Sequence, residues 1–341
     1  MNDPFAEQEE RPAHLHLAYP ALRDTLPFLR LGTPRSPVRR LTGLTENADL
    51  WLKDEGPYGD GGWGGNKIRK LEWLIPDAKR QGRETIFTVG GLGTNWGLAT
   101  ALYGRDHGLK TALALVDQPI DDHVRAQLAR LEASGATIHR THSKAQTIAR
   151  APLLLARHFS GTTPPYYLPA GGSSAIGALG YVEAAFEIAE QVKTGALPEP
   201  SYIVTAVGSG GTAAGLLLGL QLAGLKTRVV GIVVNDTLPL DAGALSKLAR
   251  RCEKLLKARG AELPDTSLAA ADLDARFEWL GAGYGHGTAA GEAAAALTAE
   301  RAGLELDPVY TAKAMAALLE LDREQYFGDG PVLFLNTNGP R

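Results

Sequence analysis

The sequence predicts an α/β protein with two open, mostly parallel twisted sheets that are covered by helices. From Glu84 onward, short β-like runs alternate with helix-length segments, and several of the strand candidates are continuously apolar. Such strands are typical of a parallel sheet buried on both faces. The alternation falls into two series, near residues 85–170 and 200–335. The length of 341 residues also exceeds the size at which single cores stop growing, so we expect two lobes.

Each series supplies its own strands and helices. The expected strands are 85–89, 110–116, 136–140, 202–207, 227–234 and 332–335. The expected helices are 94–107, 121–134, 145–159, 173–192, 212–222, 240–259, 287–302 and 311–321. Residues 1–48, rich in Pro and Arg, are expected to form an arm with a short helix near 19–25.

Composition excludes several classes of protein. The net charge is -3 with both signs interspersed, so no basic footprint indicates nucleic acid or an anionic membrane surface as a partner. The one cysteine, Cys252, rules out an intrachain disulfide and favours a reducing compartment. Residues 1–11 lack an apolar signal core, and the apolar runs are too short to cross a bilayer. We therefore expect a soluble, cytoplasmic protein.

Glycine is the informative excess, with 40 residues. Its clusters lie at 56–65, 90–97, 171–180, 208–215 and 281–287. Glycine permits close approach of backbone to a ligand, and ligands of open α/β sheets bind beyond the carboxyl ends of strands. The clusters near 90 and 208 follow predicted strands, one in each series. We expect the active site between the two lobes.

The segment Gly208-Ser209-Gly210-Gly211-Thr212 lies between an apolar strand candidate and a helix candidate. Consecutive N–H groups in such a turn form a nest for an anion, and the positive helix N-terminus adds to it. Ser209 and Thr212 contribute hydroxyl donors. The pattern predicts a phosphate site.

The same loop fits more than one kind of phosphate ligand. Gly208-x-Gly210-x-x-Ala213 also matches the dinucleotide fingerprint, which favours a nicotinamide-dependent oxidoreductase. The acidic residue required about 20 positions later is poorly matched by Asp236, which comes later. This alternative stays open at this point. A P-loop is excluded because Gly-Lys-Ser/Thr does not follow the turn.

A second motif centres on Lys67, which directly follows Gly64-Gly65-Asn66 and opens a predicted helix. Desolvation and the helix N-terminus both disfavour an ammonium there, so the amine becomes more nucleophilic. The alternative is a solvated surface lysine in a basic cluster with Arg69 and Lys70.

Residues 64–72 read Gly-Gly-Asn-Lys-Ile-Arg-Lys-Leu-Glu, and the segment 51–79 closely resembles the 1-aminocyclopropane-1-carboxylate (ACC) deaminase and D-cysteine desulfhydrase family. These are fold type II, tryptophan synthase β-like enzymes that use pyridoxal 5′-phosphate (PLP). The resemblance continues in order through blocks near 89–91, 169–173, 177–181, 208–215, 283–285, 306–311 and 333–339. It implies a homodimer with a large PLP-binding domain formed by 1–68 and 181–341, and a small domain formed by 69–180.

The resemblance also implies roles for individual residues. Lys67 is similar to the lysine that forms the Schiff base with PLP, and Asn66 beside it is expected to bind the cofactor. The phosphate is held by Gly208, Ser209, Gly210, Gly211 and Thr212. Around the ring, the resemblance places Tyr310 stacked on the pyridine, Asn95 at the 3′-oxygen, and Thr311 and Thr337 near the ring nitrogen.

The implied reaction acts on a small amino acid. We expect Lys67, Thr94, Tyr284 and Tyr310 to be catalytic, with the amine of Lys67 taking the α-proton. Thr311 stands where D-cysteine desulfhydrases carry threonine and ACC deaminases carry glutamate. Because a hydroxyl does not favour a pyridinium, the pattern predicts α,β-elimination that gives a 2-oxo acid and ammonia. An ACC deaminase-like ring opening and an inactive PLP-binding protein stay open as alternatives.

The expected substrate contacts are Thr94, Asn95, Trp96 and Tyr284, and part of this set departs from the family. The family reads Gln-Ser-Asn followed by His or Gln, whereas this chain reads Gly93-Thr94-Asn95-Trp96. A site that loses a hydrogen-bonding partner rejects its former substrate strongly. The departures predict a pocket altered at Gly93, Thr94 and Trp96, with a bulkier or less polar amino acid as substrate.

No metal site is expected. The pairs His14-x-His16 and His139-x-x-His142 have no third ligand nearby in the sequence.

Overall fold

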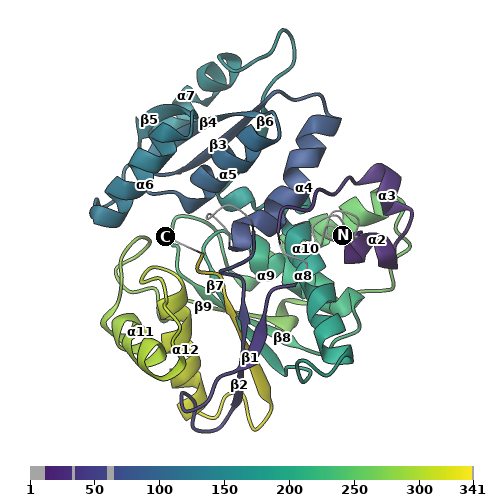
Figure 1. Cartoon of the computed structure of the whole chain (residues 1–341), viewed down its shortest axis with the longest axis vertical. Coiled ribbons are helices and arrows are strands. Elements are labelled where there is room, and N and C mark those ends of the chain that lie inside the picture. Colours follow the sequence, from purple (N-terminus) through teal and green to yellow (C-terminus); the bar gives the residue numbers. More distant parts are fainter. Residues whose placement is uncertain (1–11, 33–34, 60–64, 340–341) are drawn as a thin grey trace, which may run out of the picture.

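The computed structural model describes residues 12–32, 35–59 and 65–339, and it contains two separate sheets (Figure 1). The predicted acidic segment 1–11 and Gly64 of the lysine motif lie outside the described residues. The predicted fold class is confirmed. In Figure 1 the smaller sheet lies in the upper lobe and the larger sheet in the lower one.

The larger sheet has six strands in the order β1-β2-β10-β7-β8-β9. They are β1 (Val38–Arg40), β2 (Asp49–Asp54), β10 (Pro331–Asn336), β7 (Tyr202–Val207), β8 (Arg228–Val233) and β9 (Leu273–Arg276). All neighbouring pairs are parallel except β1 with β2. The C-terminal strand β10 therefore lies inside the sheet, between β2 and β7.

Helices cover both faces of the larger sheet because its strands are apolar on both sides. Along β7, Ile203 and Val207 face a core with α8 (Ala175–Lys193), α9 (Gly211–Leu222) and α10 (Ala242–Ala258). The alternate residues Val204 and Ala206 face a second core with α11 (Ala289–Ala302) and α12 (Thr311–Arg323). This two-sided burial explains the continuous apolar runs that predicted parallel strands.

The smaller sheet has four parallel strands in the order β5-β4-β3-β6. They are β5 (Thr137–His142), β4 (Lys110–Val116), β3 (Thr85–Gly91) and β6 (Tyr166–Leu168). On one face, Leu113 and Leu115 pack with α5 (Asn95–Asp106) and α6 (Asp122–Ala133). On the other, Ala112 and Ala114 pack with α7 (Lys144–Ala156).

Helix α4 (Asn66–Arg80) connects the two halves of the molecule. Its residues Leu71 and Leu74 share a core with β3 and α5, and Trp73 lies in the core with α8. At Gly180 of α8, an added Cβ would lie 2.2 Å from the backbone oxygen of Arg69, so only glycine permits this close helix contact. The position of α4 is thereby fixed against both halves.

The N-terminal arm contains two short helices, α2 (His14–Ala18) and α3 (Leu22–Thr25), where one was expected. Most of its leucines are buried, and the Glu183 carboxylate on α8 accepts the N–H groups of His14 and Leu15 at 2.6 and 2.9 Å. The arm is thus part of the large core. Two short 3₁₀ turns, Ala170–Gly172 and Ala270–Asp272, complete the fold.

The predicted strands 110–116 and 202–207 are confirmed to the residue. The short strands β1, β6 and β9 and the six-residue strand β2 were not predicted. The domain boundaries at 68/69 and 180/181 remain a prediction. Among the described residues, no helix is both long and apolar enough to cross a membrane.

Candidate active site

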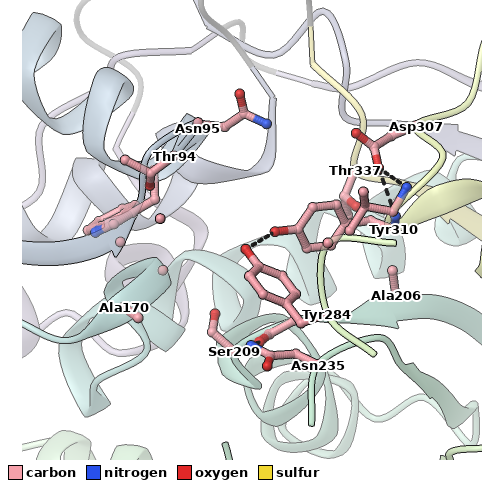
Figure 2. A pocket seen from close by; sticks show the side chains of 18 of the residues that line it. Thr94, Asn95, Ala170, Ala206, Ser209, Asn235, Tyr284, Asp307, Tyr310 and Thr337 are labelled. Carbon is pink, nitrogen blue, oxygen red and sulfur yellow. Dashed lines mark hydrogen bonds between the residues drawn. The ribbon is translucent and has the colours of Figure 1, made fainter. Parts of the chain in front are cut away.

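A cavity lies between the two sheets, where the first turns of α4, α5, α9 and α12 come together (Figure 2). In Figure 2, Thr94 and Asn95 lie on one side of it, and Ser209, Tyr284 and Tyr310 on the other. The cavity is lined by all the predicted site residues except Gly211, that is, by Asn66, Lys67, Thr94, Asn95, Trp96, Gly208, Ser209, Gly210, Thr212, Tyr284, Tyr310, Thr311 and Thr337.

The predicted phosphate loop forms the turn between β7 and α9. Gly210 adopts a left-handed conformation at φ 86° and caps α9. Within the described chain, the N–H groups of Ser209, Gly210 and Thr212 make no hydrogen bond. Donors that converge without a partner at a helix N-terminus are the arrangement that binds a phosphate group.

A second turn braces this loop. Ser173 Oγ accepts the N–H of Gly211 at 3.0 Å and donates to Ser209 Oγ at 2.8 Å. A Cβ on Gly171 would lie 2.2 Å from Ser209 Oγ, so glycine is needed there. The glycine clusters near 171 and 208 therefore meet in space.

Lys70 is a site residue that the sequence reasoning missed. It is buried, lines the cavity and donates from Nζ to the carbonyl of Gly171 at 2.8 Å. A Cβ on Gly211 would lie 3.0 Å from this Nζ, which places the amine beside the phosphate loop. Burial, and then the positive charge of Lys67, lower the pKa of Lys70 to about 7. The available signal was its spacing, because residues three apart share a helix face.

The lysine motif opens α4 after Gly65, whose φ is 90°. Lys67 is half-buried and lines the same cavity as the phosphate loop. Asn66 Oδ1 is buried and has no hydrogen-bond partner among the described residues. The alternative of a solvated basic cluster is wrong, because Arg69 and Lys70 are 1% and 3% exposed.

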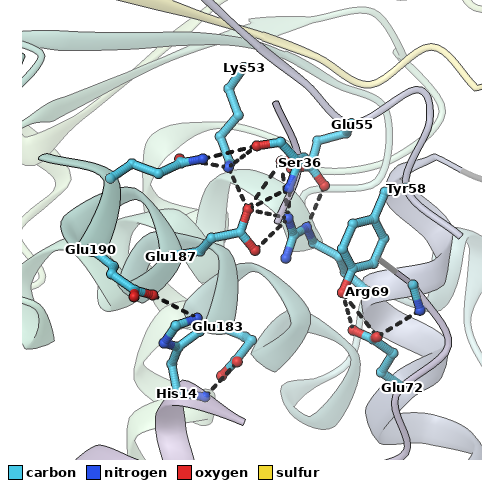
Figure 3. Close-up of polar contacts among 12 residues, drawn as sticks. His14, Ser36, Lys53, Glu55, Tyr58, Arg69, Glu72, Glu183, Glu187 and Glu190 are labelled. Carbon is cyan, nitrogen blue, oxygen red and sulfur yellow. Dashed lines mark hydrogen bonds and ion pairs between the residues drawn. The ribbon is translucent and has the colours of Figure 1, made fainter. Parts of the chain in front are cut away.

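Arg69 anchors α4 from behind in a buried network of charges (Figure 3). Its guanidinium binds both carboxylate oxygens of Glu55 and contacts those of Glu187 at 3.1 Å. Lys53 Nζ donates to Glu187 at 2.6 Å and to Gln191 at 2.9 Å. Burial would raise the pKa of Glu187, but Arg69 and Lys53 outweigh it and hold that pKa at about 2. The helix that carries Lys67 is thus fixed from both sides.

Two tyrosines close the cavity on the side of the larger sheet. The hydroxyl groups of Tyr284 and Tyr310 are 2.6 Å apart and share a hydrogen bond. Burial raises the pKa of both, so both are protonated near neutral pH. Asp307 Oδ1 accepts the N–H groups of Val309 and Tyr310, each at 2.7 Å, and holds the turn before α12.

The two predicted threonines, Thr311 and Thr337, line the cavity next to the tyrosines. Thr311 begins α12 and is 1% exposed, and its Oγ1 accepts the N–H of Asp307 at 2.7 Å. Its own hydroxyl hydrogen remains available as a donor. Thr337 lies at the carboxyl end of β10 and is 7% exposed.

The wall on the smaller sheet is the start of α5. Thr94 is its N-cap, and its Oγ1 accepts the N–H of Gly97 at 3.0 Å. The amide oxygen of Asn95 accepts a hydrogen bond from Gln127 of α6. Asn95 is therefore held by a second helix.

Trp96 touches the cavity, but most of its side chain belongs to the core. It is 4% exposed, and its Nε1 donates to Thr88 Oγ1 at 2.8 Å. A Cβ on Gly172 would lie 2.4 Å from its ring, so the indole packs on that glycine. Its polar atom is already satisfied inside the protein.

Comparison with known proteins agrees with this geometry. Residues 29–338 match the family of pyridoxal-phosphate dependent enzymes, so the chain belongs to that family. Two relatives are D-cysteine desulfhydrases. The one from Serratia proteamaculans (strain 568) is 36% identical, covering 92% of this chain and 94% of the relative. The one from Salmonella typhimurium is 35% identical, covering 96% of each chain.

A solved structure of an ACC deaminase homologue superimposes with a TM-score of 0.78 at 28% identity, covering 93% of each chain. A fungal L-serine ammonia-lyase from Rhizomucor miehei, 18% identical with a TM-score of 0.61, shares the fold. The predicted family and the cofactor PLP are confirmed. The protein is a PLP-dependent enzyme of the lyase and deaminase type, and the nicotinamide alternative is set aside.

Proposed function

We propose that the protein catalyses α,β-elimination on a small amino acid, with D-cysteine as the first candidate, and releases a 2-oxo acid and ammonia. The observation that carries this proposal is that Lys67 and the loop Gly208–Thr212 line one cavity between the two sheets. For cysteine, the balanced reaction takes up one water and gives pyruvate, hydrogen sulfide and ammonia.

The described residues fit PLP. The open N–H groups of Ser209, Gly210 and Thr212 would hold its phosphate, with the amine of Lys70 as a charged donor on the other side. Asn95 and the unpartnered Oδ1 of Asn66 would bind polar atoms of the ring and its linkage. Gly211 belongs to the same loop, although its own N–H is bound to Ser173.

Tyr310 would stack on the pyridine ring. An added Cβ on Gly208 would lie 2.8 Å from the Tyr310 ring, which places that ring directly against the phosphate loop. Its hydroxyl partner, Tyr284, is protonated near neutral pH and can donate a proton or a hydrogen bond, but it is not a base.

When bound, PLP supplies an electron sink for the carbanion that forms at Cα of the substrate. Lys67 would hold the cofactor covalently, and its Nζ would take the α-proton of the substrate. Thr94 and the first turn of α5 would seat the substrate carboxylate. Tyr284 and Tyr310 then stand on the opposite wall as proton donors for the leaving group.

Thr311 favours elimination. Because its Oγ1 already accepts the N–H of Asp307, its hydrogen is free to donate to an unprotonated ring nitrogen. Thr337 would be a further neighbour of that nitrogen. A hydroxyl donor does not stabilise a pyridinium as a carboxylate would, so Thr311 would favour loss of a β-leaving group over reactions that need charge delocalised into the ring.

Purified protein tests the proposal directly. We expect a yellow protein that borohydride bleaches and that releases pyruvate from D-cysteine and from β-chloroalanine. Lys67→Ala removes the covalent link and the base, and we expect a loss of at least about a thousandfold in kcat. Lys79→Ala, an exposed lysine at the far end of α4, is the matched control and should behave as the unmodified protein.

The same assay separates the alternatives. Activity on ACC without activity on cysteine, serine or β-chloroalanine would reverse the proposal in favour of ring opening. A yellow protein that turns over none of these amino acids would instead indicate PLP binding without catalysis.

A homodimer is also proposed on the basis of the family resemblance, and a cytoplasmic location on the basis of the composition. Light scattering on the purified protein measures the mass in solution. A mass equal to one chain would contradict the dimer.

A further inference from the structure

We propose that Gln118 determines substrate binding: its Nε2 donates a hydrogen bond to the carboxylate of the amino-acid substrate. This inference rests on the proposed function, because it requires an amino acid in the cavity. Gln118 directly follows β4, is half-buried and lines the cavity between the sheets. It belongs to none of the motifs that predicted the site.

The Gln118 amide lies across the glycine turn that follows β3. Its Oε1 accepts the N–H of Gly93 at 3.2 Å. A Cβ on Gly91 would lie 2.1 Å from that Oε1, and one on Gly93 would lie 3.3 Å from Nε2. The space that side chains at 91 and 93 would fill is therefore occupied by an amide from the neighbouring strand.

This contact fixes which end of the amide is available to a ligand. With Oε1 bound to Gly93, the free end is Nε2, which makes no hydrogen bond within the described residues. The next residue, Pro119, restricts the backbone of Gln118 to extended conformations. The nearby Asp121 uses its carboxylate to cap α6 at Val124. Gln118 thus presents a positioned donor.

The surrounding groups identify the ligand. At the start of α5, the N–H groups of Asn95 and Trp96 make no hydrogen bond within the described chain. Asn95, Trp96 and Gln118 all line the cavity, and Nε2 of Gln118 lies 3.3 Å from where a Cβ on Gly93 would be, two residues before Asn95. A carboxylate accepts several hydrogen bonds and donates none, so it matches this set.

The inference revises one expectation from the sequence. The sequence predicted a pocket altered at Gly93, Thr94 and Trp96, with a bulkier or less polar amino acid as substrate. Gln118 restores a polar group at Gly93, and the indole of Trp96 is held in the core. The wall therefore recognises the part that all amino acids share, whatever their side chain.

Binding of D- and L-alanine to the PLP-loaded enzyme provides the test, since alanine has no β-leaving group. Calorimetry gives Kd directly, without turnover. We expect Gln118→Leu to weaken binding by about tenfold to a hundredfold. The same factor should apply to 2-aminobutyrate, which has a larger side chain and also no β-leaving group, and propylamine, which lacks the carboxylate, should be unaffected. Gln146→Leu, the same change at an exposed site on α7, is the matched control.

Gly91→Ala gives an independent test that leaves Gln118 in place. The three atoms nearest to a Cβ at 91 all belong to Gln118, the nearest at 2.1 Å, so a methyl group there must displace this side chain. We expect Gly91→Ala to reproduce the loss of affinity of Gln118→Leu. In a Gln118→Ala background, it should have no further effect.

The outcomes are distinguishable. An unchanged Kd in Gln118→Leu, at unchanged PLP content, overturns the inference. A loss that varies with the side chain of the ligand overturns the assignment to the carboxylate. If the unmodified PLP-loaded protein binds no amino acid at all, the proposed function itself fails.

Discussion

Two polar regions flank α4, and they treat charge in opposite ways. Behind the helix, the network of Lys53, Glu55, Arg69 and Glu187 is fully buried, and every charged group in it has an opposite charge as partner (Figure 3). In front of it, the cavity contains open N–H groups and an unpartnered amide oxygen on Asn66. The paired charges of the network position the helix, whereas the unpaired polar groups of the cavity are available to a ligand.

Breaking the network gives the largest expected effect on stability. Glu187→Ala leaves Arg69 and Lys53 buried with too little negative charge, and we expect a loss of about 3–5 kcal/mol in the free energy of unfolding. Glu190→Ala, one turn further along α8, removes a partly exposed partner of Arg35 and should cost less than about 1 kcal/mol. Denaturant titration measures both. Equal losses would contradict the comparison.

Replacing Lys70 should affect cofactor binding in the cavity rather than the stability of the protein. We expect Lys70→Met to weaken PLP binding by about tenfold to a hundredfold, because a charged donor to the phosphate is lost. The protein without cofactor should lose no stability, since a buried amine with a lowered pKa is replaced by an apolar chain. Equilibrium dialysis against PLP checks the first point, and thermal unfolding without PLP the second. A variant that binds PLP normally would remove Lys70 from the site.

The two regions should also respond to pH in different ranges, with stability rising as the pH rises in both. The pKa of Glu187 is lowered to about 2, so its contribution to stability is present above its unfolded value of 4.5 and is lost as the pH falls toward 2. The pKa of Lys70 is lowered from 10.5 to about 7, so the unfolded chain binds the extra proton. Stability without cofactor should therefore rise by this contribution between about pH 7 and 10.5.

The measurement is the unfolding free energy against pH for the unmodified protein and for Lys70→Met. The alkaline rise should disappear in the variant, while the acid loss should remain. An alkaline rise of the same size in both proteins would exclude Lys70 as its source.

The smallest effect is expected at the border between core and cavity. Trp96→Phe removes the hydrogen bond to Thr88 while it keeps a ring against Gly172, and we expect a cost of about 1 kcal/mol in stability. The ranking of substrates by kcat/KM should not change. A changed ranking would mean that the indole contacts the substrate, as the sequence led us to expect.

The sequence predicted the elements that depend on local patterns. The strands at 110–116 and 202–207 are largely apolar. The turn Gly208–Thr212 was recognised by its glycine and hydroxyl residues between a strand and a helix. The short strands β1, β6 and β9 contain only three or four residues, too few to show an alternating or apolar pattern. Their pairing with neighbouring strands of the sheet, which the sequence does not show, defines them.

The same distinction applies to the site. Lys67 and the phosphate loop stand in motifs, and the sequence identified them. Lys70 entered the sequence reasoning only in the alternative of a solvated cluster, because its burial by α8 and by the turn at Gly171 leaves no local pattern in the sequence. Gln118 was missed for a related reason: its relation to Gly91 and Gly93 depends on the pairing of β4 with β3.

The central position of β10 has a consequence for how the chain folds during synthesis. Asp54 and Asn336, joined by a hydrogen bond, are 282 residues apart in sequence. Strand β2 therefore cannot pair with its parallel neighbour β10 until residues 331–336 have left the ribosome. The smaller sheet, made from a continuous stretch of the chain, can form earlier. Until β10 is synthesised, the edges of β2 and β7 are exposed and prone to aggregation, and we expect chaperones to bind them.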